Sequence, residues 1–349
     1  METKVLHITD EKDKAQIEEA ARLLQEGELV IFPTETVYGL GADGLNETAV
    51  DKIFQAKGRP KDNPLILHIA DPEQVLDLVK VIPPKGKDCM DVFWPGPLTL
   101  IFERSEKVSD SITAGADTVA IRMPSHPIAH ALLKAAAIPV AAPSANTSGR
   151  PSPTRLSHVL EDMDGKVPMI VDSGDTNVGI ESTVLDVTVD PPMIYRPGGV
   201  TKEDLEAIIG EVAIDETTID ADNDAVPKSP GQKYRHYAPK GDGTLFAGDL
   251  KNIAKEINRR IAEAEPGKRT AVLCTTETKD LYEGMDLLVD MGSREHLEDV
   301  AHNLFDSLRR CDEEDVDVLF VEGFDFIGIG VGIMNRLLKA CGGKVVLGL

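Results

Sequence analysis

The stretch Phe32-Pro33-Thr34-Glu35-Thr36-Val37-Tyr38-Gly39-Leu40-Gly41 places several hydroxyl groups, a carboxylate and two glycines directly after an apolar run. That run, residues 29–32, has the length of a buried strand, and apolar residues at helical spacing before it predict an amphipathic helix over residues 13–26. Polar groups at a strand end are well placed to bind a small polar ligand, although a turn capped by threonines would have a similar sequence. We therefore expect a helix, a strand and then a candidate binding turn.

Further apolar runs of strand length follow this segment, and amphipathic stretches interrupt them at irregular intervals. Asn46 is placed to cap a helix that ends near residues 57–59, and two more helices are expected near residues 127–137 and 202–209. Many short strands with irregularly interleaved helices favour an α/β fold with an open, twisted, mixed sheet over residues 1–210. The expected strands cover residues 65–69, 98–102, 119–123, 140–142, 169–171, 183–187 and 193–195.

The composition changes over residues 211–240, where an acidic stretch without aromatic residues passes into a Lys-Ser-Pro-Gly sequence typical of a linker. Beyond it, residues 241–349 alternate regularly between strand-like and helix-like segments, which predicts a smaller Rossmann-like domain with a parallel sheet. This domain has no G-x-G-x-x-G after its first strand, and tight packing explains its late glycines, so dinucleotide binding is not favoured. Its expected strands are 244–246, 270–274, 286–289 and 316–321, and its expected helices lie near 250–264, 276–283, 293–310 and 333–340.

Charge and composition limit the classes of partner. The chain has 349 residues, a formal net charge of -23 and a pI near 4.7, so its surface repels a phosphate backbone, and any anion must be held by a local basic cluster. No apolar run approaches the roughly 20 residues of a membrane helix, and the first ten residues do not resemble a secretion signal. The four cysteines are far apart and form no metal-binding pattern. These features predict a cytoplasmic protein without a membrane span.

Three basic positions stand out against this acidic background. The segment Lys57-Gly58-Arg59-Pro60-Lys61 carries three cations, which suit a polyphosphate, although one or two of them could simply offset a helix dipole. Arg122 lies inside an apolar strand, where a charge is costly unless it meets a ligand carboxylate or a structural ion-pair partner. Arg196 lies in the third cluster, Tyr195-Arg196-Pro197-Gly198. These positions predict anion binding.

Small polar side chains at other strand ends complete this pattern. Ser144 and Asn146 follow one expected strand, and Glu181-Ser182-Thr183 precedes another. The sequence has no nucleophile elbow and no Walker A loop, and a reaction driven by positioning ATP beside a second substrate needs neither of them.

Taken in order, these motifs resemble the long form of the threonylcarbamoyl-AMP synthase family, in which a YrdC-type catalytic domain precedes a smaller C-terminal domain. The resemblance covers nearly the whole chain. It rests on the segment at residues 33–41, Lys57 with Arg59, Asn63-Pro64-Leu65, Trp94-Pro95-Gly96-Pro97-Leu98-Thr99, Ser144 with Asn146, and the segment at residues 229–239.

The resemblance implies a nucleotidyltransferase that condenses L-threonine, bicarbonate and ATP into threonylcarbamoyl-AMP and pyrophosphate. The product would supply a transfer RNA modification through a downstream threonylcarbamoyl transferase complex, with weak or indirect contact to the transfer RNA itself. Mg2+ would be carried by the ATP phosphates, with no metal held by the protein alone. No general base is identified, because Glu35 could equally be a structural carboxylate.

The resemblance also assigns roles to particular residues. It implies that residues 211–240 form a lid over the active site with Tyr234, His236 and Tyr237 in it, although the linker could also be docked permanently on the surface. L-threonine would be held by Thr36, His68, Arg122, the backbone at Ala142, and Ser182. ATP would be held by Lys57, Arg59, Asn63, Thr118, Ser144, Asn146, Ser152 and Arg196.

Two other functions share parts of this sequence pattern. An RNA-binding YrdC-type module without synthase activity is the alternative, and the acidity of the chain argues against it. Carbamoyl transfer in hydrogenase maturation uses a related domain, but that role would bring an acylphosphatase-like domain and cysteine-rich zinc motifs, which this sequence lacks.

Overall fold

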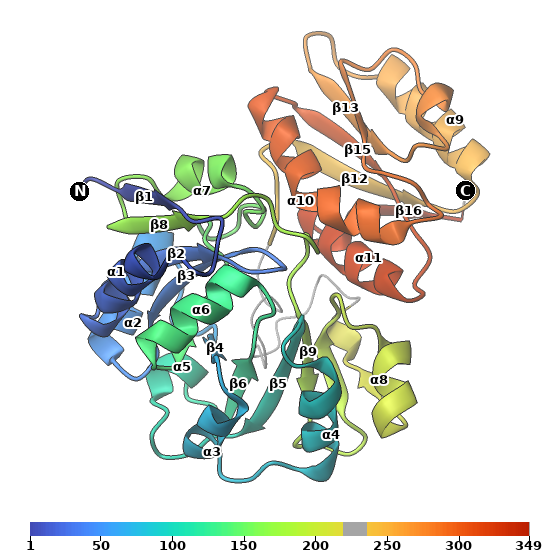
Figure 1. The fold of residues 1–349 in the computed structure, drawn as a ribbon. Helices are drawn as coiled ribbons and strands as arrows, with labels where there is room; N and C mark the ends of the chain where they lie inside the picture. Colours follow the sequence, from blue (N-terminus) through green and yellow to red (C-terminus); the bar gives the residue numbers. More distant parts are fainter. Residues whose placement is uncertain (219–235, 349) are drawn as a thin grey trace. The chain divides into compact units, whose positions relative to one another are not determined.

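The computed structural model describes residues 1–218 and 236–348, which divide into two compact units (Figure 1). The N-terminal unit contains Met1–Ser148 and Ser152–Thr218. The C-terminal unit contains the short segment Gly149–Pro151 and the chain from His236 onward. Within the described ranges, no helix has the length and apolar character needed to cross a bilayer.

The N-terminal unit is built on one large mixed sheet with the strand order β1-β8-β2-β3-β7-β4-β6-β5-β9-β10-β11. Parallel pairs such as β4 with β6 stand beside antiparallel pairs such as β5 with β6. This confirms the predicted open mixed sheet. The strands are β1 (Lys4–His7), β2 (Val30–Pro33), β3 (Tyr38–Asp43), β4 (Ile66–His68), β5 (Leu98–Glu103), β6 (Thr118–Arg122), β7 (Val140–Ala141), β8 (Met169–Asp172), β9 (Thr183–Asp186), β10 (Met193–Arg196) and β11 (Ala213–Ile214).

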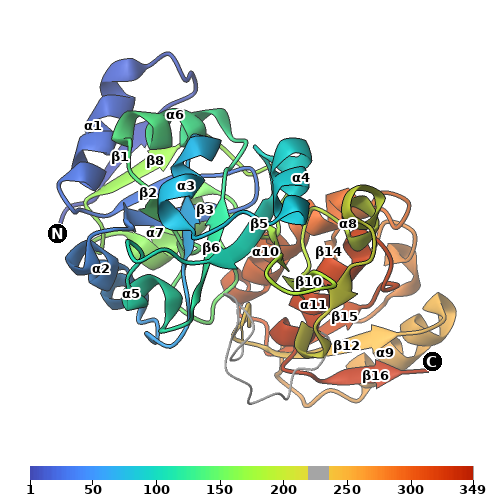
Figure 2. The same cartoon turned by 90° about the horizontal axis from the view of Figure 1, so that it is seen from below.

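Helices α1, α2, α6 and α8 of this unit follow the sequence signals that predicted them, whereas α3, α4, α5 and α7 were not predicted. In α2, the Asn46 side chain accepts hydrogen bonds from the backbone of Thr48 and Ala49, and Gly58 ends the helix with a left-handed backbone at φ 63°. Helices α1 and α6 lie side by side (Figures 1 and 2) and pack their apolar faces into one core cluster. The helices are α1 (Lys14–Gln25), α2 (Glu47–Lys57), α3 (Val75–Leu78), α4 (Pro84–Phe93), α5 (Asp110–Thr113), α6 (Pro127–Ala136), α7 (Leu156–Met163) and α8 (Lys202–Ile209).

The candidate binding turn is narrower than the sequence suggested. Its second half is β3, which pairs antiparallel with β2 so that Pro33 faces Tyr38 and only residues 34–37 form the turn. The Thr34 hydroxyl closes this turn by donating to the carbonyl of Val37, while it accepts from the backbone N–H groups of Thr36 and Val37. The glycines at 39 and 41 hid the strand, because glycine weakens an apolar strand pattern.

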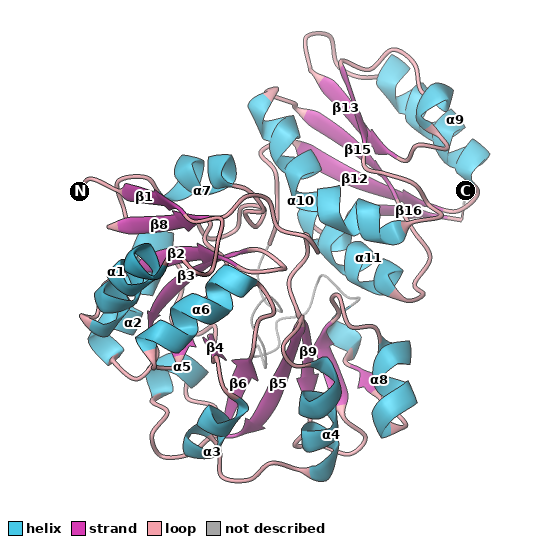
Figure 3. Cartoon of the chain, viewed as in Figure 1, coloured by secondary structure: helices cyan, strands magenta, loops and turns pink. Residues whose placement is uncertain are grey.

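The C-terminal unit has a wholly parallel sheet in the order β14-β13-β15-β12-β16. Helix α9 covers one face and helices α10 and α11 cover the other (Figure 3). The chain crosses the sheet in one direction from β12 to β14 and in the opposite direction from β14 to β16, so right-handed connections place the helices on opposite faces. The predicted parallel α/β unit is confirmed. Its elements are β12 (Asp242–Ala247), α9 (Leu250–Ala262), β13 (Thr270–Cys274), β14 (Leu287–Asp290), α10 (Leu297–Glu313), β15 (Val318–Glu322), α11 (Ile329–Ala340) and β16 (Val345–Leu347).

One helix predicted in this unit is wrong. The helix expected near residues 276–283 is reduced to a single 3-10 turn at Lys279–Leu281. The Thr278 hydroxyl donates to the carbonyl of Thr275, and the Asn258 side chain accepts from the backbone of Glu283. These local bonds compete with the helical ladder, so the segment folds as a turn.

Candidate functional site

The register of the N-terminal sheet aligns polar side chains across five neighbouring strands. His68 of β4 is paired with Arg122 of β6, Arg122 with Thr99 of β5, Thr99 with Val184 of β9, and Val184 with Arg196 of β10. Laterally paired residues project from the same face of a sheet. Three residues predicted from the sequence, His68, Arg122 and Arg196, therefore lie in one row, with the hydroxyl of Thr99 between the two arginines.

Arg122 meets one of the two partners that the sequence analysis left open, the structural ion-pair partner, and a ligand carboxylate stays a prediction. It is 4% exposed, and its Nη2 donates to Glu35 Oε1 at 2.6 Å, so it does form a structural ion pair. Its Nη1 donates to Thr36 Oγ1 at 2.9 Å and its Nε to the carbonyl of Gly96 at 3.4 Å. A guanidinium has five N–H groups, so these bonds leave one on each Nη. That pair of donors matches the two oxygens of a carboxylate.

The two titratable groups beside Arg122 have shifted pKa values. Burial would raise the pKa of Glu35, but the charge and hydrogen bond of Arg122, together with the backbone N–H groups of Glu35 and Ser125, outweigh burial and hold that pKa below its usual range. Burial, with help from the Arg122 charge, lowers the pKa of His68 to about 3. At neutral pH the site therefore contains an ionised Glu35, a charged Arg122 and a neutral imidazole.

Ser182 and Arg196, predicted for different substrates, are in direct contact. Arg196 Nη2 donates to Ser182 Oγ at 3.1 Å and its Nε to the Ser182 carbonyl at 3.0 Å. Thr99 Oγ1 lies 2.8 Å from the same hydroxyl. Gly198 permits this approach, because a Cβ there would lie 2.4 Å from the carbonyl oxygen of Glu181 and 2.6 Å from the carbonyl carbon of Ser182.

A second group of predicted residues surrounds Lys57. Its Nζ donates to the backbone carbonyl of Ser144, to that of Asn146 at 2.6 Å and to Asn146 Oδ1 at 3.4 Å. Arg59 Nη2 donates to the carbonyls of Asn63 at 3.4 Å and Pro64 at 2.9 Å. The end of α2 and the segment after β7 thus bring together three residues predicted for ATP, and a fourth, Arg59, orders the loop that holds a fifth, Asn63.

The other predicted residues of this unit occupy separate positions. Thr118 begins β6, four residues before Arg122 on the same face of the strand. The backbone N–H of Ala142 donates to the carbonyl of Ile66 at 3.1 Å. Ser152 is fully buried, and its hydroxyl donates to Glu181 Oε1.

The buried cations of the N-terminal unit are all site residues. Over its described residues, the buried lysines and arginines are Lys57, Arg122 and Arg196, which are 2%, 4% and 5% exposed. Burying a charge is costly unless it is paired or hydrogen-bonded. In a chain of net charge -23, these three buried cations are candidates for the local basic site that the sequence analysis expected for an anion.

The predicted lid falls mostly outside the described residues, and Tyr234 is among those not described. The other two residues predicted for the lid, His236 and Tyr237, belong to the C-terminal unit. Tyr237 is 4% exposed and stacks at 5.0 Å on Phe305 of α10, and the ring of His236 lies 5.5 Å from that of Tyr237. Tyr237 is therefore part of the packing of this unit.

Sequence reasoning missed the roles of Thr99 and Gly96. Both belong to the Trp94-Pro95-Gly96-Pro97-Leu98-Thr99 motif, but the sequence analysis gave neither residue a role of its own. The signal that could have found Thr99 is its place at the start of an apolar strand, since it is a fully buried hydroxyl that requires a partner.

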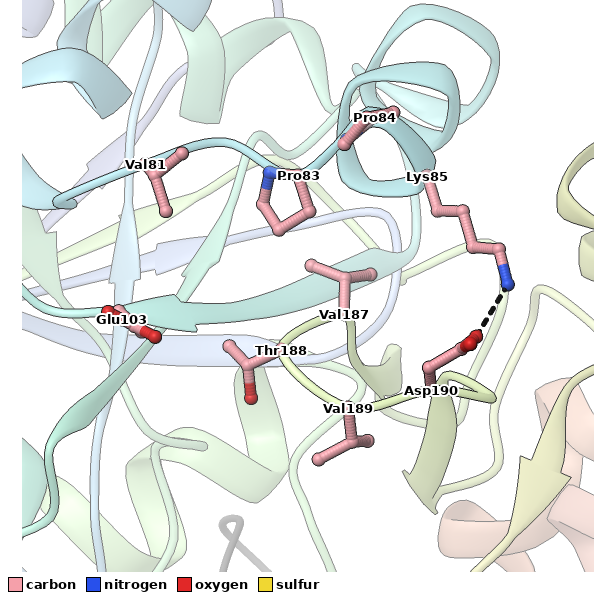
Figure 4. A pocket seen from close by; sticks show the side chains of 9 residues that line it. All are labelled: Val81, Pro83, Pro84, Lys85, Glu103, Val187, Thr188, Val189 and Asp190. Atoms are coloured by element: carbon pink, nitrogen blue, oxygen red, sulfur yellow. Dashed lines mark hydrogen bonds and ion pairs between the residues drawn. The ribbon is translucent and has the colours of Figure 1, made fainter.

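A cavity of about 440 Å³ lies elsewhere in the N-terminal unit (Figure 4). It adjoins Glu103 and Val187, at the ends of β5 and β9 that are opposite Thr99 and Ser182. None of the predicted site residues lines it, and its polar chemistry includes an ion pair between Lys85 and Asp190 at 2.9 Å. Its walls are formed by Val81, Pro83, Pro84, Lys85, Glu103, Val187, Thr188, Val189 and Asp190.

The residues around Lys57 fit phosphate better than a bare metal ion. They offer ammonium, guanidinium, amide and hydroxyl groups, and the described residues contain no cluster of three metal-binding side chains. Mg2+ prefers carboxylate, phosphate and water oxygens. A magnesium ion at this site would be held through the phosphates of a nucleotide, and this stays a prediction.

Comparison with known families covers almost the whole chain. The model of a family described as "Telomere recombination" matches residues 22–198, and the model described as "Threonylcarbamoyl-AMP synthase, C-terminal domain" matches residues 200–342.

Individual relatives match this chain over nearly their full length. The Bacillus subtilis protein named threonylcarbamoyl-AMP synthase is 48% identical over 342 residues, 97% of each chain. The Pyrococcus abyssi protein of the same name is 45% identical over 345 residues, 99% of each chain. The crystal structure of P. abyssi Sua5 complexed with L-threonine superposes with a TM-score of 0.93 at 44% identity, and covers 98% of this chain and 99% of that one. This chain belongs to the threonylcarbamoyl-AMP synthase family.

Proposed function

We propose that this chain is a threonylcarbamoyl-AMP synthase that converts L-threonine, bicarbonate and ATP into threonylcarbamoyl-AMP and pyrophosphate. The observation that carries the proposal is the buried row His68, Arg122, Thr99 and Arg196, with two N–H groups of Arg122 still free to bind a carboxylate. The P. abyssi relative, 44% identical to this chain, was solved with L-threonine bound.

Arg122 is the proposed anchor of the L-threonine carboxylate. Its contacts with Glu35, Thr36 and Gly96 fix the guanidinium in one orientation, so little conformational freedom is lost when a ligand binds. The neutral imidazole of His68 and the hydroxyl of Ser182 offer hydrogen bonds without adding a second positive charge.

The proposed ATP site lies around Lys57, Arg59, Asn63, Ser144 and Asn146. A buried ammonium and a guanidinium supply positive charge for a polyphosphate, and Thr118, Ser152 and Arg196 complete the set. Mg2+ on the phosphates would neutralise further charge and help pyrophosphate to leave.

The proposed reaction has two steps. The amine of L-threonine attacks the carbon of bicarbonate, forming a C–N bond and releasing water, which gives a carbamate. A carbamate oxygen then attacks the α-phosphorus of ATP, and the bond to the β-phosphate oxygen breaks with loss of pyrophosphate. These steps make the enzyme a nucleotidyltransferase that works chiefly by orienting its substrates and neutralising phosphate charge.

The carbamate and the mixed anhydride are both labile in water, which supports the proposal that a lid lies within residues 211–240. Ala213 and Ile214 pair with β10 as strand β11, so a moving lid would have to follow them. Tyr237 is packed against Phe305 in the C-terminal unit, so a moving lid would have to precede this residue. The lability of the product also supports rapid consumption by a threonylcarbamoyl transferase complex that modifies transfer RNA.

The direct test is pyrophosphate release from ATP and Mg2+ with bicarbonate, measured with L-threonine, with L-serine and without an amino acid. We expect release that depends on L-threonine and falls by at least tenfold in the Arg122→Ala variant. A matched control is Arg104→Ala, which removes a partly exposed arginine at the far end of β5 that donates to Asp110 at 2.6 Å.

Threonine-independent release, or equal effects of both substitutions, would contradict the proposal. Absence of release under all these conditions would favour the RNA-binding alternative. Binding of a labelled RNA in the absence of ATP would then be measured.

A further inference from the structure

One carboxylate oxygen in the site has no partner although it is buried. Glu35 is 5% exposed, and its Oε1 accepts from Arg122 Nη2 at 2.6 Å. Its Oε2 is also buried and accepts no hydrogen bond from the protein. Buried polar atoms are nearly always hydrogen-bonded, and an unsatisfied one costs free energy, so such an atom in a binding site indicates a missing donor.

The charge state of Glu35 defines the donor that its Oε2 requires. The Arg122 guanidinium holds the pKa of Glu35 below its usual range, so this carboxyl is ionised at neutral pH and can only accept hydrogen bonds. A ligand group that donates to it is favoured further if it carries a positive charge.

The groups that face Glu35 leave its Oε2 available. His126 caps α6, and its Nδ1 accepts from the backbone of Ile128 at 3.2 Å and of Ala129 at 3.5 Å, which places its proton on Nε2. Burial lowers the pKa of His126, so its imidazole is neutral. The backbone N–H groups of Glu35 and Ser125 also approach the carboxylate and help to lower its pKa, but neither meets the geometry of a hydrogen bond to Oε2. The neutral His68 faces the carboxylate as well. Among these groups, Arg122 is the charged one.

Arg122 and Glu35 together present a charge pattern complementary to a zwitterion. The guanidinium has two free N–H groups, and the carboxylate in contact with it has one free oxygen. An α-amino acid carries a carboxylate and an ammonium on the same carbon, so it can lie along this ion pair with opposite charges facing each other.

We propose that Glu35 is a specificity-determining residue, whose Oε2 binds the ammonium group of the amino-acid substrate while Arg122 binds its carboxylate. The site then selects an α-amino acid and rejects hydroxy acids of the same shape, and it delivers the nitrogen at a fixed position. The inference rests on the proposed function, because it concerns the substrate of that same site.

The alternative is that Glu35 only positions Arg122. The two roles differ in how they treat a ligand that lacks the amine. If Glu35 binds the ammonium, its loss weakens only ligands that carry an amine. If Glu35 positions Arg122, its loss weakens every ligand with a carboxylate by the same factor.

The test measures binding by calorimetry for two ligands: L-threonine, and (R)-3-hydroxybutanoate, which keeps the hydroxyl and carboxylate but has no amine. For the wild-type protein we expect L-threonine to bind about ten- to a hundredfold more tightly, the range for a hydrogen bond between charged groups. In the Glu35→Gln variant, which keeps an oxygen for Arg122, this ratio should fall to near one through loss of L-threonine affinity.

Thr36→Val is the matched control, because it removes the other side-chain anchor of Arg122 and leaves the carboxylate in place. It should weaken both ligands equally and preserve the wild-type ratio. Circular dichroism establishes that each variant is folded, and the wild-type ratio tests the inference without any variant.

The inference would be overturned if the wild-type protein bound L-threonine and (R)-3-hydroxybutanoate with nearly equal affinity. It would also be overturned if the Glu35→Gln variant kept the wild-type ratio of these two affinities. A wild-type protein that binds neither ligand would instead contradict the proposed function. The two failures are therefore distinguishable.

Discussion

Arg196 Nη2 donates a hydrogen bond to Ser182 Oγ at 3.1 Å, which joins a residue predicted for ATP to one predicted for L-threonine. A second bond from Arg196 Nε to the Ser182 carbonyl, at 3.0 Å, fixes the backbone of the same residue. If these residues bind the substrates that we propose, the two proposed sites share a rigid connection, and a change on the ATP side should affect the threonine side.

Replacing Arg196 with glutamine should weaken L-threonine binding even in the absence of ATP. The variant removes both bonds from Arg196 to Ser182 and leaves that hydroxyl with Thr99 as its remaining side-chain contact, so we expect an affinity loss of about tenfold. Calorimetry without nucleotide measures this effect. Lys202→Gln, on the partly exposed face of α8, is the control and should bind normally. Unchanged threonine affinity in Arg196→Gln would show that the two sites are independent.

Removing Arg122 should destabilise the fold as well as abolish binding. Arg122→Ala leaves the Glu35 carboxylate buried without its ion-pair partner, which costs about 3–5 kcal/mol of unfolding free energy. Urea denaturation measures the loss. The double variant Arg122→Met with Glu35→Gln should recover at least half of it, because no charge then remains buried, but it should not recover threonine binding. A double variant as unstable as Arg122→Ala would contradict this account.

The destabilisation by Arg122→Ala should depend on pH. In the wild type, the pKa of Glu35 is lowered in the folded state, so its contribution is present above the unfolded pKa of about 4.3 and is lost as the pH falls through the folded value. In the variant, burial without Arg122 raises that pKa, so stability is lost as the pH rises. The stability difference between the two proteins should therefore be largest near neutral pH and shrink below about pH 4. A pH-independent difference would argue that Glu35 is not the cause.

His68 should remain neutral throughout the physiological range. Burial and Arg122 lower its folded pKa to about 3, well below the unfolded value of about 6.5. Between these values the unfolded chain binds a proton that the folded chain does not, so stability should fall by up to about 1.4 kcal/mol per pH unit as the pH drops. NMR titration of the imidazole tests the assignment directly. A His68 midpoint above pH 5 would contradict it.

Local elements of the fold could be predicted because their signals are local. The apolar spacing that predicted α1 is buried as expected at Ile17, Ala20, Ala21 and Leu24, and Asn46 caps α2. Strand β3 escaped prediction because its glycines break the apolar pattern. Helix 276–283 failed because threonine hydroxyls bond the backbone there.

The site was predictable in its residues but not in its contacts. Arg122 drew attention as a charge inside an apolar strand, yet its partner Glu35 is 87 positions away in the chain and belongs to a different strand connection. That pairing follows from the strand order, which nothing local in the sequence encodes. The row from His68 to Arg196 likewise depends on register across five strands.

Thr99 provides the sharpest test of that row, because only the structure assigns it a role. Its hydroxyl lies 2.8 Å from Ser182 Oγ, and Thr99→Val removes this contact while keeping the side-chain shape. We expect L-threonine affinity to fall about two- to tenfold, the range for one neutral hydrogen bond, with the KM for ATP nearly unchanged. Thr113→Val is a matched control, since Thr113 is equally buried but its hydroxyl has no hydrogen-bond partner. That variant should bind normally and be at least as stable as the wild type, because it removes a buried unsatisfied group. Equal binding losses in both variants would mean that the row does not position Ser182 for the substrate.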